Sequence, residues 1–363
     1  MKKNKNYVDL KDQPVPEGQH LLEVDGLKMY FHTEDGVVRA VDGVSYTLDR
    51  GETLGVVGES GSGKSVTAMT IMGLISMPPG KIEGGDVRYR GRSILEMTEE
   101  EMQHIRGNDI AMIFQDPMTS LNPVYKIGKQ VGEGLRLHRG YSKQEALKRA
   151  TELLDLVGIP EPEKRVNEYP HQFSGGMRQR VMIAMALACD PDILIADEPT
   201  TALDVTIQAQ IIELMQEMQE KNGNAIIMIT HDLGVVADMA DKIMVMYAGR
   251  PVEFGTAEEI FYESRHPYTW GLIRSIPEQA IDEKKPLTPI HGNPPSLMNL
   301  PEGCVFSPRC PYATDKCRKQ RPERVVTESG HYSACHYSGD PEFLKNAPET
   351  SRTRMDSKKG GEA

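Results

Sequence analysis

The stretch of sequence that decides the fold is Gly58-Glu59-Ser60-Gly61-Ser62-Gly63-Lys64-Ser65. It matches the pattern G-x-x-x-x-G-K-[ST], follows the apolar run Gly55 to Val57, and precedes a helix expected to begin near Val66. A strand, a glycine-rich turn and a helix in this order predict a phosphate-binding loop. A chance glycine-rich turn is the alternative, and so long a match in this setting disfavours it.

Each part of this loop has a physical role in holding a nucleotide. The glycines let backbone N–H groups curl around phosphate oxygens, and the N-terminus of the following helix adds positive potential. Lys64 is expected to contact the β and γ phosphates, and Ser65 to supply a hydroxyl to Mg²⁺. The predicted nucleotide contacts run from Gly58 to Val66. The loop alone leaves the use of the nucleotide open.

A second nucleotide-binding element is Ile193-Leu194-Ile195-Ala196-Asp197-Glu198, an apolar strand with two carboxylates at its end. Asp197 is placed to hold Mg²⁺, directly or through water, as the Walker B aspartate does. Glu198 suits a residue that orients or deprotonates the attacking water. Alone, an Asp-Glu pair after an apolar run is also typical of a solvated loop start. Together with the phosphate loop it favours ATP hydrolysis.

The alternation of strand-like and helical segments predicts an α/β fold of the P-loop NTPase type. Between Leu21 and about Gly255, short apolar runs are each followed by polar or glycine-rich residues, where open α/β sheets bind their ligands. The runs are Gly55 to Val57, Ile110 to Phe114, Ile193 to Ala196 and Ala225 to Thr230. The pattern turns helical from about residue 117 to 172, which predicts a helical insertion.

Composition and charge exclude several classes of protein. The chain has 363 residues, 42 Lys and Arg against 53 Asp and Glu, and a net charge of -11, which argues against a nucleic-acid partner. No apolar run approaches the roughly 20 residues that a spanning helix needs. The segment from Met1 to Gly18 lacks the apolar core of a signal peptide. We therefore expect a cytoplasmic location, where cysteines bind metals more readily than they form disulfides.

The segment Phe173-Ser174-Gly175-Gly176-Met177-Arg178-Gln179-Arg180 resembles the signature sequence of the ABC ATPases. It keeps the central S-G-G of the usual L-S-G-G-Q, with Phe173 in place of Leu and Met177 in place of Gln. The resemblance implies that Ser174, Gly175, Gly176 and Met177 cap the γ-phosphate bound to a partner subunit. Two such subunits would then enclose two Mg-ATP molecules head to tail.

Other residues match ABC elements in the expected order. Gln115 resembles the Q-loop glutamine that contacts Mg²⁺ or the attacking water, and His231 resembles the switch histidine that contacts the γ-phosphate. Asp204, in Ala202-Leu203-Asp204, resembles the D-loop residue that reaches the opposite subunit. Phe31, rather than the adjacent Tyr30, lies where such ATPases stack an aromatic ring on adenine. The alternative for Phe31 is a strand aromatic packed in the core.

Two further regions resemble the ATPases of dipeptide and oligopeptide importers. They are Asp116-Pro117-Met118-Thr119-Ser120-Leu121-Asn122-Pro123 after Gln115, and His266-Pro267-Tyr268-Thr269 followed by Ile290-His291-Gly292-Asn293-Pro294-Pro295. The resemblance implies three kinds of partner, namely a second ATPase subunit, two membrane permease subunits and an extracytoplasmic peptide-binding protein. The subunit would lie at the cytoplasmic face of the membrane. Nickel, haem and oligosaccharide importers share parts of this pattern and remain alternatives for the cargo.

Four of the five cysteines, Cys304, Cys310, Cys317 and Cys335, follow the spacing C-x5-C-x6-C-x17-C. Four thiolates suit either a zinc ion or an iron–sulfur cluster, and unliganded thiols are the third possibility. The resemblance to peptide-importer ATPases implies a [4Fe-4S] cluster. The remaining Cys189 is expected to be a small core residue.

The predicted organisation has four parts. Residues 1–20 form a polar N-terminal segment, 21–260 the nucleotide-binding domain, 261–339 a small cysteine-rich extension, and 340–363 a disordered polar tail. A soluble ABC ATPase acting on DNA or the ribosome is a rival, but no coiled-coil insertion or basic patch is visible. A P-loop kinase is another, and it leaves Phe173 to Arg180 unexplained.

Overall fold

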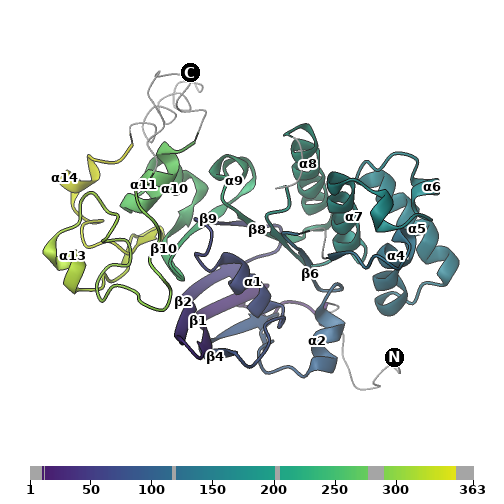
Figure 1. Ribbon diagram of the computed structural model, residues 1–363, viewed down its shortest axis with the longest axis horizontal. Helices are drawn as coiled ribbons and strands as arrows, with labels where there is room; N and C mark the ends of the chain where they lie inside the picture. The colour runs from purple at the N-terminus through teal and green to yellow at the C-terminus, as the bar shows by residue number, and fades with distance from the viewer. Residues whose placement is uncertain (1–9, 12, 117–119, 201–204, 277–289, 349–363) are drawn as a thin grey trace.

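The computed structural model describes residues 10–11, 13–116, 120–200, 205–276 and 290–348 (Figure 1). Two sheets occupy the middle of the molecule, a group of helices lies at one end, and the cysteine-rich segment lies at the other. The D-loop residue Asp204 and residues 117–119 of the region after Gln115 fall outside the described residues. The α/β class predicted from the sequence is confirmed.

The larger sheet has eight strands in the order β11-β12-β10-β9-β3-β8-β7-β6. The strands are β3 (Thr53–Val57), β6 (Ile110–Ile113), β7 (Ile193–Asp197), β8 (Ala225–Thr230), β9 (Lys242–Tyr247), β10 (Arg250–Thr256), β11 (Val325–Val326) and β12 (Tyr332–Ser333). All residues of β3, β6, β7 and β8 are buried. These four strands pair in parallel and are covered on both faces, which explains their continuous apolar sequences.

The register of the parallel strands brings their carboxyl ends to one edge. Val57 of β3 pairs with Thr230 of β8, and Asp197 of β7 pairs with Ile229 of β8. Each strand is followed directly by one of the segments that the sequence singled out. Residues from four distant parts of the chain therefore meet at this edge.

The smaller sheet is antiparallel and covers part of the larger one. Its order is β2-β1-β4-β5, formed by β1 (Leu22–Thr33), β2 (Gly36–Leu48), β4 (Gly80–Tyr89) and β5 (Arg92–Ser93). Buried side chains of both sheets share one hydrophobic core with α1 (Lys64–Ile71) and α2 (Glu99–Ile105). Helix α1 begins at the end of the phosphate loop and packs into this core, so the core lies next to the loop.

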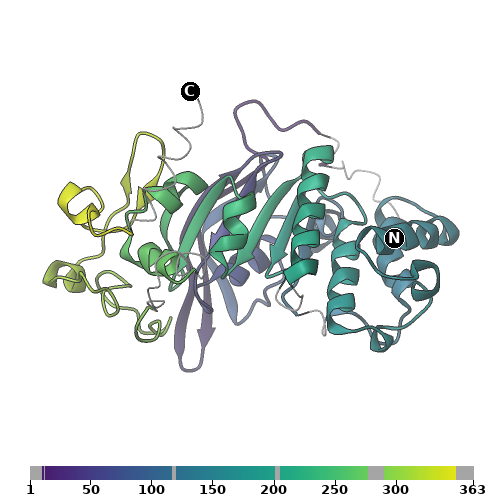
Figure 2. The same ribbon diagram turned by 90° about the horizontal axis from the view of Figure 1, so that it is seen from above.

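Several of the other helices gather at one end of the molecule. The group at the right of Figure 1 lies in and just after the range where the sequence predicts a helical insertion. It comprises α4 (Ile127–His138), α5 (Lys143–Leu156), α6 (Pro162–Arg165), the 3₁₀ turn η1 (Pro170–Gln172) and α7 (Gly175–Leu187). Figure 2 shows it from above as a lobe beside the sheets. The remaining helices are α8 (Val205–Asn222), α9 (Leu233–Met239), α10 (Ala257–Tyr262), α11 (Pro267–Arg274), α13 (Asp315–Lys319) and α14 (Pro341–Leu344).

The C-terminal extension continues the main sheet instead of standing apart. Its strands β12 and β11 add antiparallel to β10, with Phe254 paired to Tyr332. The sequence places the start of a disordered tail at Asp340, and this boundary is too early. Residues 340–348 are described, α14 begins at Pro341, and the Phe343 ring packs 5.3 Å from that of Trp270. The Phe343 ring and the hydrogen bond from Arg274 to the Asn346 carbonyl oxygen hold this segment on the extension.

The N-terminal segment, which the sequence predicts to be a separate polar segment, contacts the nucleotide-binding domain. Leu10 is fully buried in the core between the two sheets. The Lys11 ammonium donates hydrogen bonds to main-chain carbonyls near Asp190. The part of the segment that the structure describes therefore packs on the nucleotide-binding domain. Within the described residues no helix is long and apolar enough to pass through a bilayer.

A buried ion pair joins the two sheets. The Arg90 guanidinium donates to the Asp192 carboxylate at 2.5 Å, both side chains are 3% exposed, and the Tyr89 hydroxyl donates to the same carboxylate at 2.7 Å. Burial raises the pKa of Asp192, but the hydrogen bonds from Arg90 and Tyr89 outweigh it and hold the pKa below its ordinary value. The ionised carboxylate thus stabilises the folded chain.

We expect Asp192→Asn to lower the free energy of unfolding by about 3 kcal/mol at pH 7, because it leaves the Arg90 charge buried without a counter-ion. Since the folded-state pKa is depressed, the carboxylate's contribution is complete above about pH 4 and disappears as the pH falls through the folded-state pKa. Urea denaturation at pH 7 and at pH 3 measures both effects. Asp190→Asn, at an exposed neighbouring position, is the matched control, and equal losses in the two variants would contradict the prediction.

Candidate functional site

The phosphate loop connects β3 to α1 and requires glycine at two positions for steric reasons. Gly58 has φ 151°, and a Cβ there would lie 2.2 Å from the carbonyl oxygen of Met246. Gly63 has φ 101°, and its Cβ would lie 2.3 Å from the carbonyl oxygen of Ala40. The loop is therefore pressed against β9 on one side and β2 on the other. Its backbone has no freedom to move toward the sheets.

The Lys64 side chain folds back over the loop. Its ammonium donates hydrogen bonds to the carbonyl oxygens of Gly58 at 2.7 Å and Glu59 at 3.0 Å. Burial lowers the pKa of Lys64, and the negative charges of Glu198, Asp197 and Glu59 oppose that shift. The two hydrogen bonds fix the Lys64 nitrogen over the loop, where a phosphate is expected to lie.

Ser65 and Asp197 meet although they are far apart in the sequence. The Ser65 hydroxyl donates to Asp197 Oδ1 at 3.0 Å. Burial raises the pKa of Asp197, the Ser65 hydrogen bond opposes it, and the Glu198 charge adds to it. A buried carboxylate beside a hydroxyl offers the hard oxygen ligands that Mg²⁺ takes in NTPase sites, so the donor set fits this ion.

Glu198 occupies a strained position at the end of β7. Its φ is 48°, a left-handed conformation that costs a residue other than glycine about 1–3 kcal/mol. The Glu198 N–H donates to the Ile229 carbonyl at 2.9 Å, which fastens this turn to β8.

Two side chains from the neighbouring strand ends contact the Glu198 carboxylate. Gln115, after β6, donates through Nε2 to Oε2 at 3.0 Å. His231, after β8, places Nδ1 3.3 Å from Oε1. The sequence predicted these three residues separately, and the sheet brings them together. A carboxylate held by an amide and an imidazole can orient a water molecule and accept its proton.

The signature segment lies at the start of α7, with Ser174 as its N-cap. The Ser174 hydroxyl accepts a hydrogen bond from the Met177 N–H at 3.3 Å, and both Ser174 and Gly175 are exposed. Helix α7 is well separated from α1 in Figure 1. Its N-terminus therefore faces solvent rather than the phosphate loop of the same chain.

Gln179 is a residue that the sequence reading did not single out. It lies one turn into α7, is fully buried, and donates through Nε2 to the Pro199 carbonyl oxygen at 2.7 Å. This contact joins the signature helix to the residue after Glu198. Gln179 lies within the signature segment, but the sequence gives it no separate role, because the contact depends on how the helical group docks on the sheet.

The two candidate adenine contacts differ in their surroundings. The Tyr30 hydroxyl donates to Asp42 at 3.0 Å, and Asp42 also accepts from Arg250. Phe31, the next residue of β1, packs partly buried against the core beneath the phosphate loop. The geometry thus gives Tyr30 a structural hydrogen bond. The stacking role predicted for Phe31 stays a prediction.

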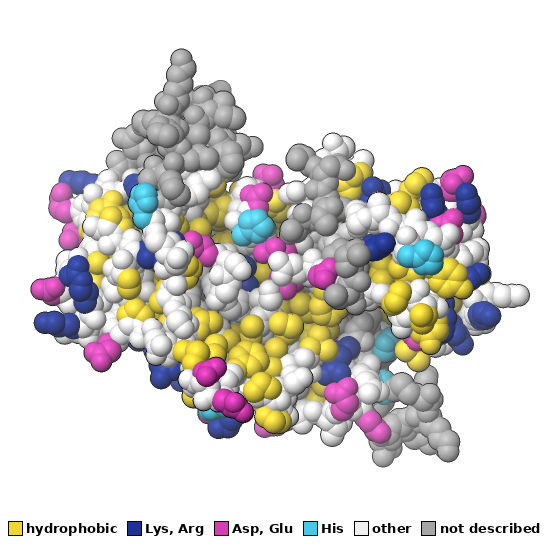
Figure 3. Space-filling view, in the orientation of Figure 1, with side chains coloured by type: hydrophobic (Ala, Val, Ile, Leu, Met, Phe, Trp, Pro, Cys, Tyr) yellow, Lys and Arg dark blue, Asp and Glu magenta, His cyan; other side chains and the backbone are white. Residues whose placement is uncertain are grey.

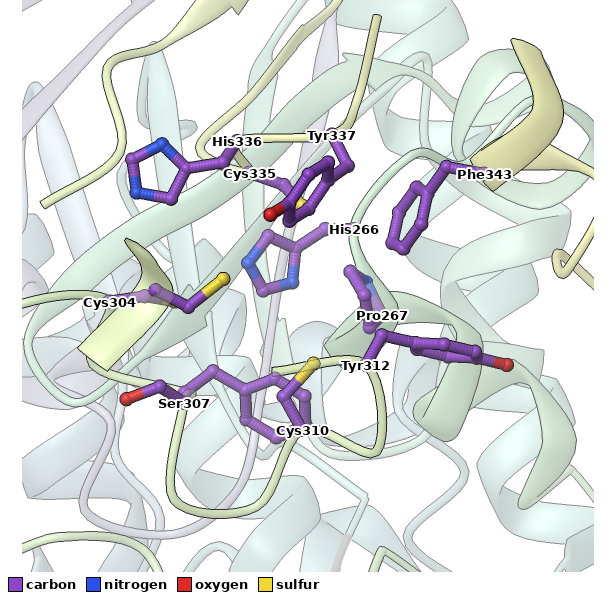
Figure 4. Close-up of a pocket in the computed structure, with 12 residues that line it drawn as sticks. His266, Pro267, Cys304, Ser307, Cys310, Tyr312, Cys335, His336, Tyr337 and Phe343 are labelled. Carbon is purple, nitrogen blue, oxygen red and sulfur yellow. The ribbon is translucent and has the colours of Figure 1, made fainter. Parts of the chain in front are cut away.

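The four clustered cysteines line one pocket in the C-terminal extension, between α11, α13 and β12. Figure 4 shows the sulfur atoms of Cys304, Cys310 and Cys335 around the imidazole of His266, and Cys317 lines the same pocket. Burial lowers the pKa of His266 to about 3, so this imidazole is neutral at ordinary pH. Cys189 lies elsewhere and is buried in the core, as the sequence predicts.

The thiols influence one another's protonation. Burial raises the pKa of Cys335 to about 12 and that of Cys310 to about 11, and the nearby cysteines add to both shifts. Among the described residues, no three His, Cys, Asp or Glu side chains are grouped closely enough to hold a single metal ion. The pocket therefore gathers four thiols without the compact geometry of a one-ion site.

On the face shown in Figure 3, hydrophobic and charged side chains occupy different areas. Hydrophobic side chains gather in its lower middle, over the region of α1 and the smaller sheet, while basic and acidic side chains are interspersed around the edge. No continuous basic surface appears on this face.

The class of protein follows from the fold and this site. The family model described as ABC transporter matches residues 41–201, which span the phosphate loop, the signature and the Asp-Glu pair. The structure resembles a dimeric ATP-binding cassette solved in a post-hydrolysis state with ADP and phosphate, with a TM-score of 0.60 and 29% identity over 65% of this chain and 98% of that chain. The molecule is built as an ATP-binding cassette of the ABC type.

The C-terminal extension and the curated relatives narrow the class. The model described as oligopeptide/dipeptide transporter, C-terminal region, matches residues 252–317. The chain is 58% identical to the oligopeptide transport ATP-binding protein OppD of Bacillus subtilis, over 86% of this chain and 87% of that protein. It is 52% identical to the dipeptide transport ATP-binding protein DppD of Escherichia coli, over 88% and 97% respectively. The chain belongs to the family of oligopeptide and dipeptide transport ATP-binding proteins.

We expect Glu198→Gln to reduce ATP hydrolysis by about 10²- to 10⁴-fold, because the amide keeps the shape of the side chain but cannot accept a proton. Nucleotide affinity should stay near that of the unchanged protein, since Lys64 and Ser65 are untouched. Phosphate release and equilibrium nucleotide binding measure the two quantities separately.

The control for this substitution is Glu220→Gln on the exposed face of α8, which should leave hydrolysis unaltered. Hydrolysis that persists in Glu198→Gln would remove this carboxylate from the catalytic assignment.

Proposed function

We propose that this chain is the ATP-hydrolysing subunit of an ABC importer that drives uptake of dipeptides and oligopeptides at the cytoplasmic face of the cell membrane. The observation that carries the proposal is the meeting of Lys64, Ser65, Asp197 and Glu198 at one sheet edge, in a chain of the peptide-transport family. Related importers of nickel, haem or oligosaccharides are the alternatives for the cargo.

The bound nucleotide would lie along the phosphate loop. Backbone N–H groups from Gly58 to Val66 and the ammonium of Lys64 would receive the phosphates, and Phe31 would stack on the adenine. Ser65 and Asp197, with Gln115 nearby, would hold Mg²⁺, which neutralises charge on the phosphates. The ammonium would leave the two loop carbonyls for phosphate oxygens, exchanging neutral acceptors for charged ones.

Hydrolysis would use the trio at the strand ends. Glu198 accepts a proton from the attacking water, Gln115 helps to orient that water, and His231 donates a hydrogen bond to the γ-phosphate. The contacts of Gln115 and His231 with Glu198 hold its carboxylate in place. The strained backbone at Glu198 keeps the group directed at the loop.

A second ATPase subunit would complete each site. The exposed N-terminus of α7, with Ser174, Gly175, Gly176 and Met177, provides N–H groups that suit a γ-phosphate held by another subunit. Asp204, outside the described residues, would reach across the same interface. The separation of α7 from α1 supports this arrangement, in which two subunits enclose two nucleotides.

The membrane permease would contact the region after Gln115. There Val124 is 70% and Tyr125 43% exposed. Two adjacent large apolar side chains exposed at the surface suit a protein contact. Binding of the permease at this region would couple movement of Gln115 to the transmembrane subunits, and an extracytoplasmic protein would deliver the peptide to them.

The four cysteines would hold a [4Fe-4S] cluster, with a zinc ion as the alternative, since four thiolates can ligate either group. Four thiols around one pocket with a neutral histidine suit a larger group with thiolate ligands. A bound cluster would cross-link four points of the extension between Cys304 and Cys335.

In the complete complex with permease and binding protein in vesicles, we expect peptides to stimulate ATP hydrolysis several-fold. The reason is that cargo-loaded binding protein favours closure of the two ATPase subunits. The measurement is phosphate release with and without di- and oligopeptides. Stimulation by nickel chelates, haem or oligosaccharides instead of peptides would support the ATPase function but contradict the peptide cargo.

For the cysteine pocket, we expect the anaerobically purified chain to contain about four iron atoms per chain and to lose them in Cys335→Ser. Metal analysis and the visible absorbance of the cluster test this without reference to activity. Cys189→Ser, in the separate core, should retain the iron. A content of one zinc per chain would show that the pocket holds zinc and not an iron–sulfur cluster. Metal-free protein after anaerobic purification would contradict both the cluster and the zinc site.

A further inference from the structure

Glu59, the second residue of the phosphate loop, is held by two side chains of the C-terminal extension, Arg309 and Tyr268. We infer that Arg309 is a positioning residue of the nucleotide site, and that the extension thereby sets the affinity of the phosphate loop for ATP. This inference rests on the proposed ATPase function. It adds a residue that lies about 250 positions from the loop in the sequence.

The contact between Arg309 and Glu59 is a forked ion pair. Nη1 donates to one carboxylate oxygen of Glu59 at 2.5 Å and Nη2 to the other at 3.0 Å. The Arg309 side chain is 3% exposed and that of Glu59 is 30% exposed. A bidentate pair with a buried guanidinium constrains both the position and the orientation of the carboxylate. It differs in this respect from an exposed surface pair.

Arg309 is itself fixed on several sides. It donates to the carbonyl oxygens of His291 at 2.9 Å and Ile290 at 3.1 Å, and its Nη1 lies 3.3 Å from the Tyr247 hydroxyl. The turn that carries it is held by the hydrogen bond from the Arg309 N–H to the Phe306 carbonyl at 3.0 Å. The guanidinium is therefore preorganised, and Glu59 is the group that it positions.

Tyr268 holds the main chain of the same loop residue. Its hydroxyl accepts a hydrogen bond from the Glu59 N–H at 2.8 Å, and its side chain is fully buried. The Tyr268 ring packs against Tyr247 at 4.7 Å and Phe306 at 5.3 Å between centroids. Arg309 thus holds the side chain of Glu59 and Tyr268 holds its backbone, and both residues contact Tyr247.

The position of Glu59 matters for two physical reasons. Its carbonyl oxygen is one of the two acceptors that hold the Lys64 ammonium over the loop before nucleotide binds, so a shift of Glu59 would move the ammonium from the position in which it meets the phosphates. Its carboxylate is also a negative charge in a loop that must bind an anion. Arg309 neutralises that charge, and without Arg309 the carboxylate would repel the nucleotide phosphates.

The two effects act on binding rather than on the chemical step. Gln115, Glu198 and His231 follow β6, β7 and β8, and Arg309 contacts none of them. Removal of Arg309 should therefore weaken nucleotide affinity and raise KM, while kcat at saturating ATP changes little. Loss of a merely structural residue would lower the amount of active protein and so the apparent kcat.

The test is equilibrium titration of the purified full chain with a fluorescent ATP analogue, together with steady-state hydrolysis. We expect Arg309→Met to weaken binding about tenfold, equivalent to about 1.4 kcal/mol. Adding Glu59→Gln to that variant should restore most of the affinity, because it removes the unpaired charge. Tyr268→Phe should weaken binding in the same direction, since it leaves the Glu59 N–H without its acceptor.

The matched control is Arg318→Met, at an arginine of the same extension that is 59% exposed and makes a local ion pair with Asp315. It should bind nucleotide like the unchanged chain. Unaltered affinity in folded Arg309→Met and Tyr268→Phe would overturn the inference, as would failure of Glu59→Gln to restore binding. If the unchanged chain neither binds nor hydrolyses ATP, the proposed function itself fails, which is a separate result.

Discussion

Parallel pairing of β3, β8 and β7 is the constraint on which the rest of the structure depends. Because parallel strands all end at the same edge, the pairing of Val57 with Thr230 and of Asp197 with Ile229 places the phosphate loop, the Asp-Glu pair and His231 together. Continuous burial of these strands, with helices and the smaller sheet on their faces, holds that register. The contacts of Glu198 with Gln115 and His231 exist only while the strands stay aligned.

The phosphate loop is enclosed by this framework and by the C-terminal extension. Gly58 and Gly63 lie against main-chain carbonyls of Met246 and Ala40, so the sheets limit the loop from below. Arg309 and Tyr268 hold Glu59 from the other side. Since β12 and β11 extend the main sheet, the cysteine-rich segment is part of the same body. Phe306 lines the cysteine pocket and packs on Tyr268, so one side chain touches both regions.

Much of the site was predictable because its residues occur in short contiguous patterns. The loop from Gly58 to Ser65 and the strand ending at Asp197 and Glu198 each carry their function in local sequence, and the α/β class follows from their alternation with helices. Gln179 and Arg309 escaped notice because single polar residues in helices or turns show no pattern until the chain is folded. The tail boundary at Asp340 was wrong because composition does not register one ring, Phe343, packed on Trp270.

By itself the sequence determined which local patterns are present: a glycine-rich loop between a strand and a helix, the strand ends that bear carboxylates, and the cysteines that lie close along the chain. Local motifs suffice for this, since turn geometry and strand burial depend on neighbouring residues. Only the tertiary structure decided which of these groups touch, that Glu198 lies between Gln115 and His231, and that the extension grips the phosphate loop through Glu59. Such contacts arise from packing between segments far apart in the chain, and packing follows shape and burial that no local pattern encodes.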